Sequence, residues 1–191
     1  IAKIGKGDTV IITAASSSVG LAAIQIANSV GAISIATTRT NAKASALKAA
    51  GAAHVVVTEE QDLVKSINTI TNGKGARIVF DPIGGQGVDK LAQATSPGGM
   101  LILYGGLSLE PTLFPVASAF MKGLSLRGYV LFEIVSDKAR REAAIAFITK
   151  GLEAGTLKPV IAKTFPFDNI VEAHRYLESN AQVGKIVVTV G

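Results

Sequence analysis

Short apolar runs alternate with longer segments of helical spacing along most of the chain. Five runs without polar alternation predict buried strands over Thr9–Ala14, Ala32–Thr37, His54–Val57, Arg77–Phe80 and Gly99–Tyr104. The intervening segments predict helices over Val19–Ser29, Thr40–Ala50, Asp62–Thr71 and Val88–Thr95, the second capped by Thr40 and ended by Gly51, with a break at Pro97-Gly98-Gly99 before the fifth strand. Because strands covered on both faces lack a polar alternation, the pattern predicts an α/β fold, a Rossmann-type doubly wound parallel six-stranded sheet with helices on both faces.

Beyond Gly106 the alternation changes. The two prolines of Leu107–Val116 predict an extended loop. The rest of the chain predicts a sixth strand over Leu124–Tyr129, a helix over Lys138–Ala154, an extended segment Pro159–Phe167, a helix Asp168–Glu178 capped by Asp168, and a last strand Ile186–Val190. No linker divides the chain, so residues 1–191 are expected to form a single domain.

Composition narrows the class of protein. Of 191 residues, 48% are hydrophobic and 17% are charged, which excludes a disordered chain. With no cysteine there is no disulfide or thiolate metal site, so a reducing, cytoplasmic location is expected. No apolar stretch approaches the roughly 20 residues of a membrane span, so no membrane contact is expected. The chain starts at Ile1 without a leader, which suggests a piece of a longer protein.

The net charge of +5 does not by itself indicate a partner. Basic residues are scattered, and the densest group, Lys138, Arg140 and Arg141, lies beside Asp137 and Glu142. A cluster of mixed sign is typical of a solvated helix face, so no nucleic-acid partner is expected.

The first strand–turn–helix carries the candidate chemistry. Its turn, AASSSVG over residues 14–20, places Ala15, Ser17 and Gly20 at the glycine positions of G-x-G-x-x-G, and only Gly20 matches. A helix start offers unpaired N–H groups and partial positive charge to a pyrophosphate, and Gly20 allows close helix-to-strand packing. Ser17 would crowd the backbone approach but could donate its hydroxyl to phosphate. Small residues at a helix start also have a purely structural explanation.

The residues after the second strand bear on cofactor choice. Sites that prefer NAD place Asp or Glu there, whereas this chain reads TTRT over residues 37–40, with Lys43 one turn further on. No carboxylate lies between Asp8 and Glu59. Arg39 would pair with a 2′-phosphate and Lys43 would add charge, selecting NADP(H) over NAD(H) by about tenfold or more. The alternative is that Arg39 and Lys43 are ordinary surface residues.

An ordered set of motifs resembles the medium-chain dehydrogenase/reductase superfamily, most closely its quinone oxidoreductase-like and zinc-type alcohol dehydrogenase-like members. The motifs are TAASSSVGLAAIQIA, GAAHVV, FDPIGG, PGGMLILYGG, EAHRYLES and GKIVVTV, and the resemblance extends from Gly5 to the C-terminus. It implies the NADP(H)-binding domain of an oxidoreductase that transfers hydride between nicotinamide and a small carbonyl, alcohol, quinone or enone.

The resemblance also implies cofactor contacts at matching positions. The pyrophosphate would lie at Ser17, Ser18, Val19 and Gly20, and the ribose 2′-phosphate at Thr38, Arg39 and Lys43. Ile83 would contact the adenosine side. The nicotinamide ribose would lie at Tyr104, Gly105 and Gly106, and the carboxamide at Tyr129, Val130 and Leu131. Tyr104 and Tyr129 could equally be core aromatics.

No catalytic residue is assigned to this chain. In the resembling family an N-terminal GroES-like domain supplies substrate contacts, the proton relay and any zinc, so the isolated chain is expected to bind NADPH weakly and to turn over nothing. Two segments would return toward that domain, Pro159–Phe167 and Ile186–Val190. Two copies of the chain would associate as a homodimer through the edge strand Leu124–Tyr129. His54 and His174 are interpreted as structural histidines.

Two other functions remain as alternatives. A methyltransferase domain binding S-adenosylmethionine would need an acid after the second strand, where Thr38 and Arg39 stand instead. A non-catalytic scaffold or nucleic-acid-binding module would need a coherent basic surface.

Overall fold

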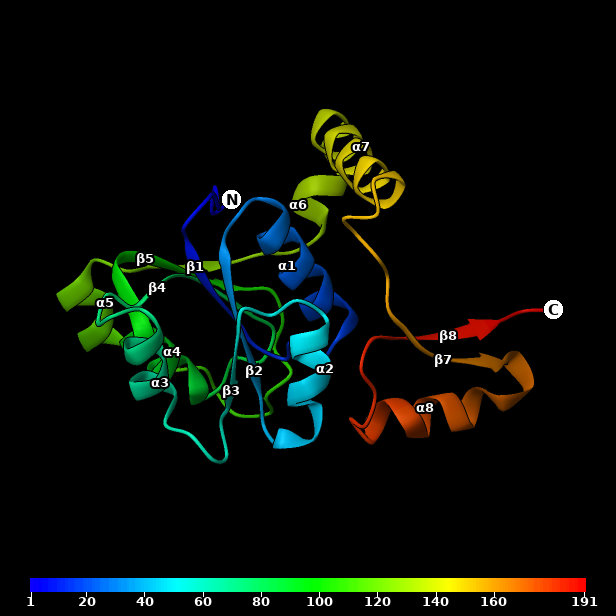
Figure 1. Ribbon diagram of the computed structural model, residues 1–191, viewed down its shortest axis with the longest axis horizontal. Coiled ribbons are helices and arrows are strands. Elements are labelled where there is room, and N and C mark those ends of the chain that lie inside the picture. The colour runs from blue at the N-terminus through cyan, green and yellow to red at the C-terminus, as the bar shows by residue number, and fades with distance from the viewer.

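The computed structural model describes residues 1–191 and contains a six-stranded parallel sheet in the order β3-β2-β1-β4-β5-β6 (Figure 1). Its strands are β1 (Thr9–Ile12), β2 (Ile33–Thr38), β3 (His54–Val57), β4 (Ala76–Asp81), β5 (Thr95–Leu103) and β6 (Ser125–Gly128). The strand order reverses between β1 and β4, and in sheets of this kind the crevice at the carboxyl ends of such strands is where ligands bind. The predicted Rossmann-type fold is confirmed.

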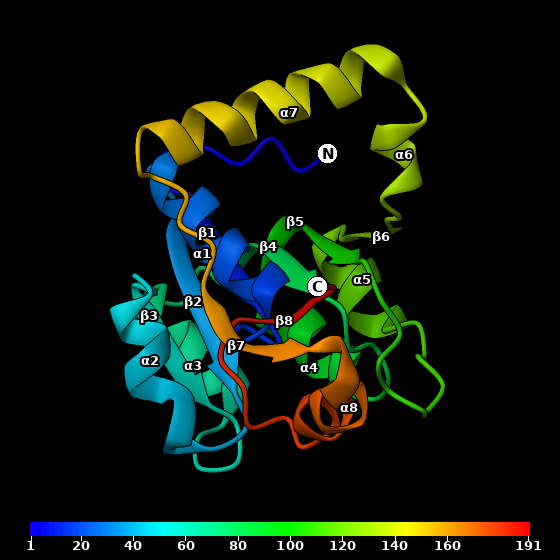
Figure 2. The same ribbon diagram turned by 90° about the vertical axis from the view of Figure 1, so that its right-hand side faces the viewer.

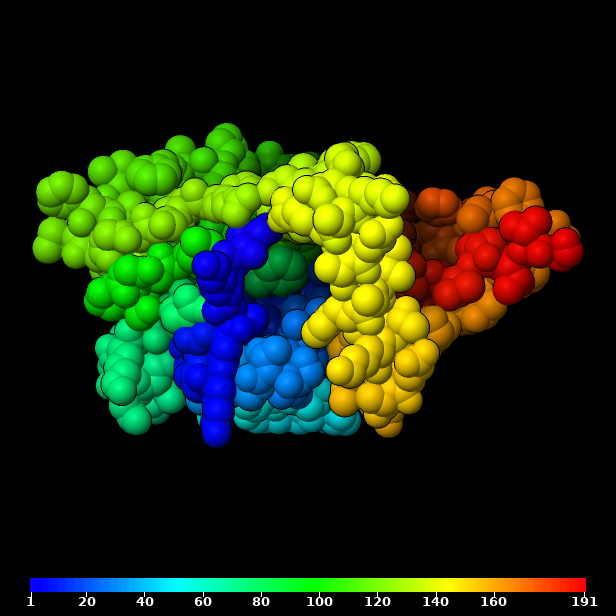
Figure 3. Space-filling model, turned by 90° about the horizontal axis from the view of Figure 1, so that it is seen from above, coloured from blue at the N-terminus to red at the C-terminus, as the bar shows by residue number.

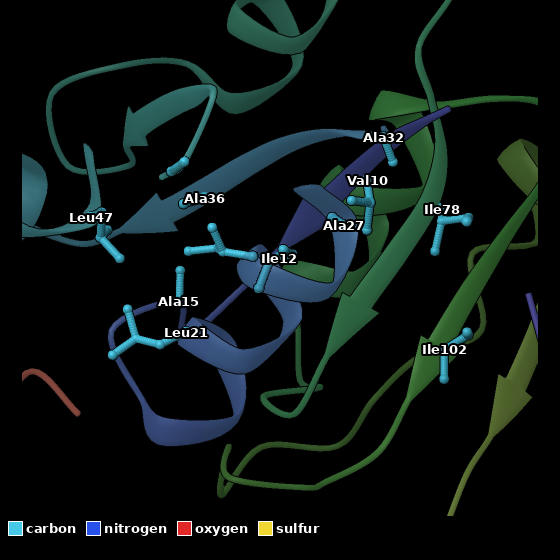
Figure 4. Packing of buried hydrophobic residues seen from close by; sticks show 12 residues of the cluster. Val10, Ile12, Ala15, Leu21, Ala27, Ala32, Ala36, Leu47, Ile78 and Ile102 are labelled. Carbon is cyan, nitrogen blue, oxygen red and sulfur yellow. The ribbon is translucent and has the colours of Figure 1, made fainter. Parts of the chain in front are cut away.

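Helices cover both faces of this sheet. They are α1 (Ser18–Ser29) and α2 (Ala44–Ala49, after the 3₁₀ turn η1, Asn41–Lys43) on one face, and α3 (Leu63–Ile70) and α4 (Gly87–Ala94) on the other. Ile12 packs with Leu21 and Leu47 in the cluster of the first face (Figure 4), whereas the neighbouring Ile11 packs with Ile67 in the cluster of the second. Both isoleucines are fully buried. Burial on both faces explains why β1 shows no polar alternation in the sequence.

A second, smaller unit follows the sheet. It comprises β7 (Ile161–Pro166), the 3₁₀ turn η2 (Phe167–Asn169), α8 (Ile170–Glu178) and β8 (Lys185–Thr189). β7 and β8 pair in parallel with each other and not with the main sheet. Figures 1 and 2 show this unit beside α1 and α2. Phe165 is its buried anchor, with its ring centroid 6.1 Å from that of Tyr176.

The helices α6 (Phe132–Val135) and α7 (Lys138–Glu153) connect the two units and contain no buried residue. Figure 2 shows α7 at the top of the molecule, and Figure 3, seen from above, shows it to one side of the N-terminal segment. The Asp137 carboxylate caps α7 by accepting from the Arg140 amide at 3.0 Å, and Lys138 lies 3.9 Å from Glu142. The predicted solvated face is confirmed. None of the helices combines the length and the apolar character that crossing a bilayer requires.

Several local predictions were wrong. α5 (Val116–Lys122) was not predicted, because its apolar sequence after Pro115 carries no side-chain cap. β5 starts at Thr95, and Pro97-Gly98-Gly99 forms a bulge within it instead of a break before it. Thr40 makes no capping hydrogen bond, since the chain there begins as a 3₁₀ turn and the Thr38 hydroxyl donates to the Thr40 carbonyl. Asp168 lies inside η2 and caps nothing.

Candidate cofactor site

The turn between β1 and α1 leaves backbone N–H groups free. Ser17 is the N-cap, and its Oγ accepts from the Gly20 amide at 3.0 Å. The Val19 amide donates to no acceptor within the chain, and the Ser18 amide faces the Gly184 carbonyl across an isolated parallel bridge. The first-turn N–H groups at the positive end of this twelve-residue helix form a site for an anion. Because the Ser17 hydroxyl accepts at this cap, its own hydrogen stays available to an anion.

Close packing of α1 against the turn depends on Gly20. A Cβ at this position would lie 2.6 Å from the Cα and carbonyl oxygen of Ala15. Only glycine therefore fits, which agrees with the packing role expected from the motif. Ala14, one residue earlier, has φ +45°, a left-handed conformation that an alanine rarely adopts.

The end of β2 holds two cations in different situations. Arg39 is exposed, and its guanidinium forms no hydrogen bond or ion pair. The Nζ of Lys43 donates to the Ser16 hydroxyl at 3.3 Å, to the Gln182 carbonyl at 2.9 Å and to the Asn180 carbonyl. Burial, and secondarily the neighbouring Arg39, lower the pKa of Lys43. Thus only one of the two predicted cations is free to meet a ligand.

A buried carboxylate shapes the loop after β4. Asp81 is fully buried, and its carboxylate accepts from the Thr13 hydroxyl and, at 2.8 Å, from the Gly84 amide. It thereby joins the ends of β1 and β4, the two strands beside the crevice. Ile83 follows in this loop and is 38% exposed. The sequence alone could not identify Thr13, 68 residues away, as the partner of Asp81.

The ends of β5 and β6 border a cavity of about 460 Å³. Its lining comprises Leu103, Tyr104, Gly105, Gly128, Tyr129, Val130 and Glu133. Four residues expected at the nicotinamide therefore share one cavity, whereas Gly106 and Leu131 lie outside its lining. The Tyr104 ring stacks on Phe80 with centroids 3.9 Å apart, and burial, reinforced by Asp81, raises the pKa of Tyr104. The Tyr129 ring packs against the core cluster of β1.

Sequence reasoning missed a second cavity, of about 240 Å³, at the start of α1. Ser17 and Ser18 form one wall, and the other wall comes from α8, β8 and the chain between them. The Gly184 amide donates to the Ser16 carbonyl at 2.9 Å, and Ser17 forms a parallel bridge with Gly184. Nothing in the local sequence of these segments signals this long-range contact.

Neither histidine lies within a metal-binding cluster. His54 is half-buried at the start of β3, and His174 is exposed on α8, where it lines the cavity beside Ser17. No group of three or more His, Cys, Asp or Glu side chains in this chain is arranged to hold a metal ion.

Comparison with known proteins agrees with this geometry. The profile of the zinc-binding dehydrogenase family matches residues 18–150. The chain is 29% identical to a 2-haloacrylate reductase of Burkholderia sp. over 97% of its length and 56% of that protein. It is 27% identical to the quinone oxidoreductase of Homo sapiens over 95% of its length and 54% of that protein. It thus spans little more than half of these relatives.

Solved structures show the same relationship. The Escherichia coli quinone oxidoreductase complexed with NADPH superposes with a TM-score of 0.90 at 27% identity, covering 98% of this chain and 59% of that one. An NAD-dependent alcohol dehydrogenase superposes with a TM-score of 0.87 at 34% identity, covering 98% and 52%. The chain belongs to the zinc-binding dehydrogenase family, as a cofactor-binding domain of the medium-chain dehydrogenase/reductase superfamily.

Proposed function

We propose that this chain binds NADP(H) for an oxidoreductase that transfers hydride between nicotinamide and a small carbonyl, alcohol, quinone or enone. The observation that carries the proposal is the free Arg39 guanidinium at the end of β2, together with the start of α1, where the Val19 amide is unpaired. These two features match the two anionic parts of NADP(H), its 2′-phosphate and its pyrophosphate.

The residues of the crevice fit such a cofactor along its length. The amides of Ser18 and Val19 would receive the pyrophosphate. Ile83 offers an apolar side chain near the adenosine position, and Thr38 adjoins Arg39. Tyr129 and Val130 border a cavity at the expected nicotinamide end. Gly105 supports this fit, because a Cβ there would lie 2.7 Å from the Pro82 carbonyl oxygen and would displace the loop that borders the crevice.

The bound nicotinamide would supply the hydride chemistry, and the residues of this chain would orient it. Substrate contacts and proton transfer, together with any zinc, are assigned to a GroES-like domain of the full-length protein. Binding, measured directly, is therefore a sharper test of this chain than turnover.

Cofactor choice rests on the residues of this chain, because the relatives include both an NADPH complex and an NAD-dependent enzyme. A guanidinium pairs with the dianionic 2′-phosphate by charge, whereas the bare ribose hydroxyl of NAD(H) offers it only a neutral acceptor. No carboxylate follows β2 to hold that hydroxyl. The expected preference is therefore for NADPH.

Isothermal titration of NADPH and NADH separately tests the proposal. The unmodified chain should bind NADPH more tightly, and Arg39→Ala should weaken NADPH by about tenfold or more while leaving NADH nearly unchanged. Arg141→Ala is the matched control, since Arg141 is an exposed arginine whose guanidinium donates to the Val135 carbonyl on the connection to α7. Equal affinity of the unmodified chain for both cofactors would contradict the proposed selection.

We also propose a homodimer formed through β6. β6 is an edge strand whose outer side pairs with nothing, and α5 beside it exposes Phe120 and Met121 by 85% and 79%. An unpaired strand edge next to exposed apolar side chains favours association with a second copy.

A further inference from the structure

The hydroxyl of Tyr104 is a buried polar group without a partner in this chain. Its oxygen is shielded from solvent and makes no hydrogen bond. Leaving a buried hydroxyl unpaired destabilises a protein, so buried polar groups almost always have a partner, which can be a bound ligand. Two other side chains contain an atom of this kind. The Arg77 Nε, however, lies 2.6 Å from the Asp8 carboxylate, and Gln182 lines the other cavity, beside Ser17.

Packing of the ring fixes the position of this hydroxyl. Tyr104 follows β5, and its ring stacks on that of Phe80 in β4, with centroids 3.9 Å apart and planes at 19°. The Tyr104 amide donates to the Asp81 carbonyl at 3.0 Å, so β4 holds both the backbone and the ring. Burial, reinforced by the Asp81 carboxylate, raises the pKa of Tyr104. The phenol therefore stays protonated and able to donate through the neutral range.

Tyr104 also lines the cavity at the ends of β5 and β6. The strand order indicates which part of a dinucleotide reaches this cavity, and this step rests on the proposed function. Arg39 follows β2 on one side of β1, whereas β4, β5 and β6 lie on the other side. With the 2′-phosphate at Arg39 and the pyrophosphate at the start of α1, the nicotinamide riboside half extends past β4 toward the cavity. Its ribose hydroxyls and its carboxamide oxygen are acceptors that suit a neutral phenol.

We propose that the Tyr104 hydroxyl is a cofactor-binding group that donates a hydrogen bond to the nicotinamide riboside half of the cofactor. The unliganded chain is destabilised by the unpaired hydroxyl, and cofactor binding supplies the missing acceptor. This oxygen atom therefore lowers the stability of the unliganded chain and raises its affinity for the cofactor. It acts on NADPH and NADH alike, because both contain the nicotinamide riboside.

Thermal unfolding of the unliganded chain tests whether the hydroxyl is unpaired. Tyr104→Phe removes the oxygen and keeps the ring, and it should raise the Tm by roughly 2–4 °C, because phenylalanine buries no unpaired polar group. Tyr176→Phe is the matched control. Tyr176 belongs to the other aromatic pair of the chain, with Phe165, and its hydroxyl is not a buried, unpaired group. An unchanged or lower Tm in Tyr104→Phe would mean that the hydroxyl already has a partner, and would overturn the inference.

Isothermal titration with whole and truncated cofactors locates the contact. Tyr104→Phe should bind NADPH and NADH about fivefold or more weakly with their ratio unchanged. It should bind 2′-phosphoadenosine 5′-diphosphate, which lacks the nicotinamide riboside, as the unmodified chain does. Arg39→Ala should give the opposite pattern, weakening NADPH and the truncated ligand while leaving NADH nearly unchanged, and Tyr176→Phe should bind all three normally.

Two titration results would contradict the inference, undiminished NADPH affinity in Tyr104→Phe and an equal loss of affinity for the truncated ligand. The second result would show that the substitution disturbs the whole crevice. If the unmodified chain binds none of the three ligands, the proposed function fails and this inference fails with it, a result that differs from a loss confined to the variant.

Discussion

The substitution Gly20→Ala probes the geometry on which cofactor binding depends. The added methyl would lie 2.6 Å from the Cα and carbonyl oxygen of Ala15 and 2.7 Å from the Ala14 carbonyl oxygen. All three are backbone atoms, so no side-chain rotation relieves the contact. α1 must therefore move away from β1, and the amides of Ser18 and Val19 move with it.

Two opposing effects set the size of this change. Alanine is preferred over glycine inside a helix by about 1 kcal/mol, and a smaller gain applies in the first turn, where Gly20 lies. Inserting a methylene into a packed site costs about 1–3 kcal/mol. The net loss of stability is therefore about 1–2 kcal/mol, which corresponds to a decrease in Tm of roughly 2–8 °C in a domain of this size. Binding of NADPH should weaken by about tenfold or more, because displacing the helix start spoils its alignment with the pyrophosphate.

Calorimetry and NADPH titration together measure both effects. Ala14→Gly is the matched variant in the same turn. Ala14 has φ +45°, so glycine removes about 1 kcal/mol of backbone strain, partly offset by the greater entropy of the unfolded chain. Its Tm should rise while that of Gly20→Ala falls. A Gly20→Ala protein with unchanged Tm and unchanged NADPH affinity would refute the close approach of α1 to the turn.

Two further predictions concern the N-terminal ion pair and the edge of the sheet. Hydrogen bonding to Arg77, whose Nε lies 2.6 Å from the Asp8 carboxylate, lowers the pKa of Asp8 below 3.8 in the folded chain. The ionised carboxylate therefore stabilises the fold above that pH, and the contribution disappears as the pH falls through the lowered value. Solvent screens this partly exposed pair, so Asp8→Asn should reduce the free energy of unfolding at neutral pH by at most about 0.5 kcal/mol. Urea titrations of both proteins should show this difference at neutral pH and no difference in strong acid. Sedimentation velocity should give twice the 19.6 kDa mass of one chain for the proposed β6 dimer, and a monomer at all concentrations would exclude it.

The fold was predictable because each strand and most helices are marked by the residues of their own segment. Each buried strand shows itself as an apolar run, and glycine at position 20 marks the approach of α1 to β1. The bulge at Pro97-Gly98-Gly99 misled the prediction, because the same residues that end a strand in a turn also permit extra residues within one. α5 was missed because it begins without a capping side chain.

The hydrogen bonds of the site could not be predicted from the sequence, because most of the acceptors are backbone carbonyls that lie far away along the chain. Lys43 bonds to the carbonyls of residues 137 and 139 positions away, and any residue type supplies such an acceptor. Asp81 and Thr13 are likewise joined only by the strand order that places β1 beside β4. A sequence shows which cations follow β2 but not which of them already has partners.

The different situations of Arg39 and Lys43 bear directly on the strength of the cofactor preference. Two charge-assisted contacts to a 2′-phosphate, at about 1.5–3 kcal/mol each, would favour NADPH over NADH by roughly 10²- to 10⁴-fold. A single contact from Arg39 corresponds to roughly 10- to 150-fold. In the unliganded chain the three N–H groups of Lys43 bond to Ser16, Asn180 and Gln182, and this arrangement corresponds to the smaller range. A measured preference well above about 10³-fold would show that Lys43 exchanges these acceptors for the 2′-phosphate when NADPH binds.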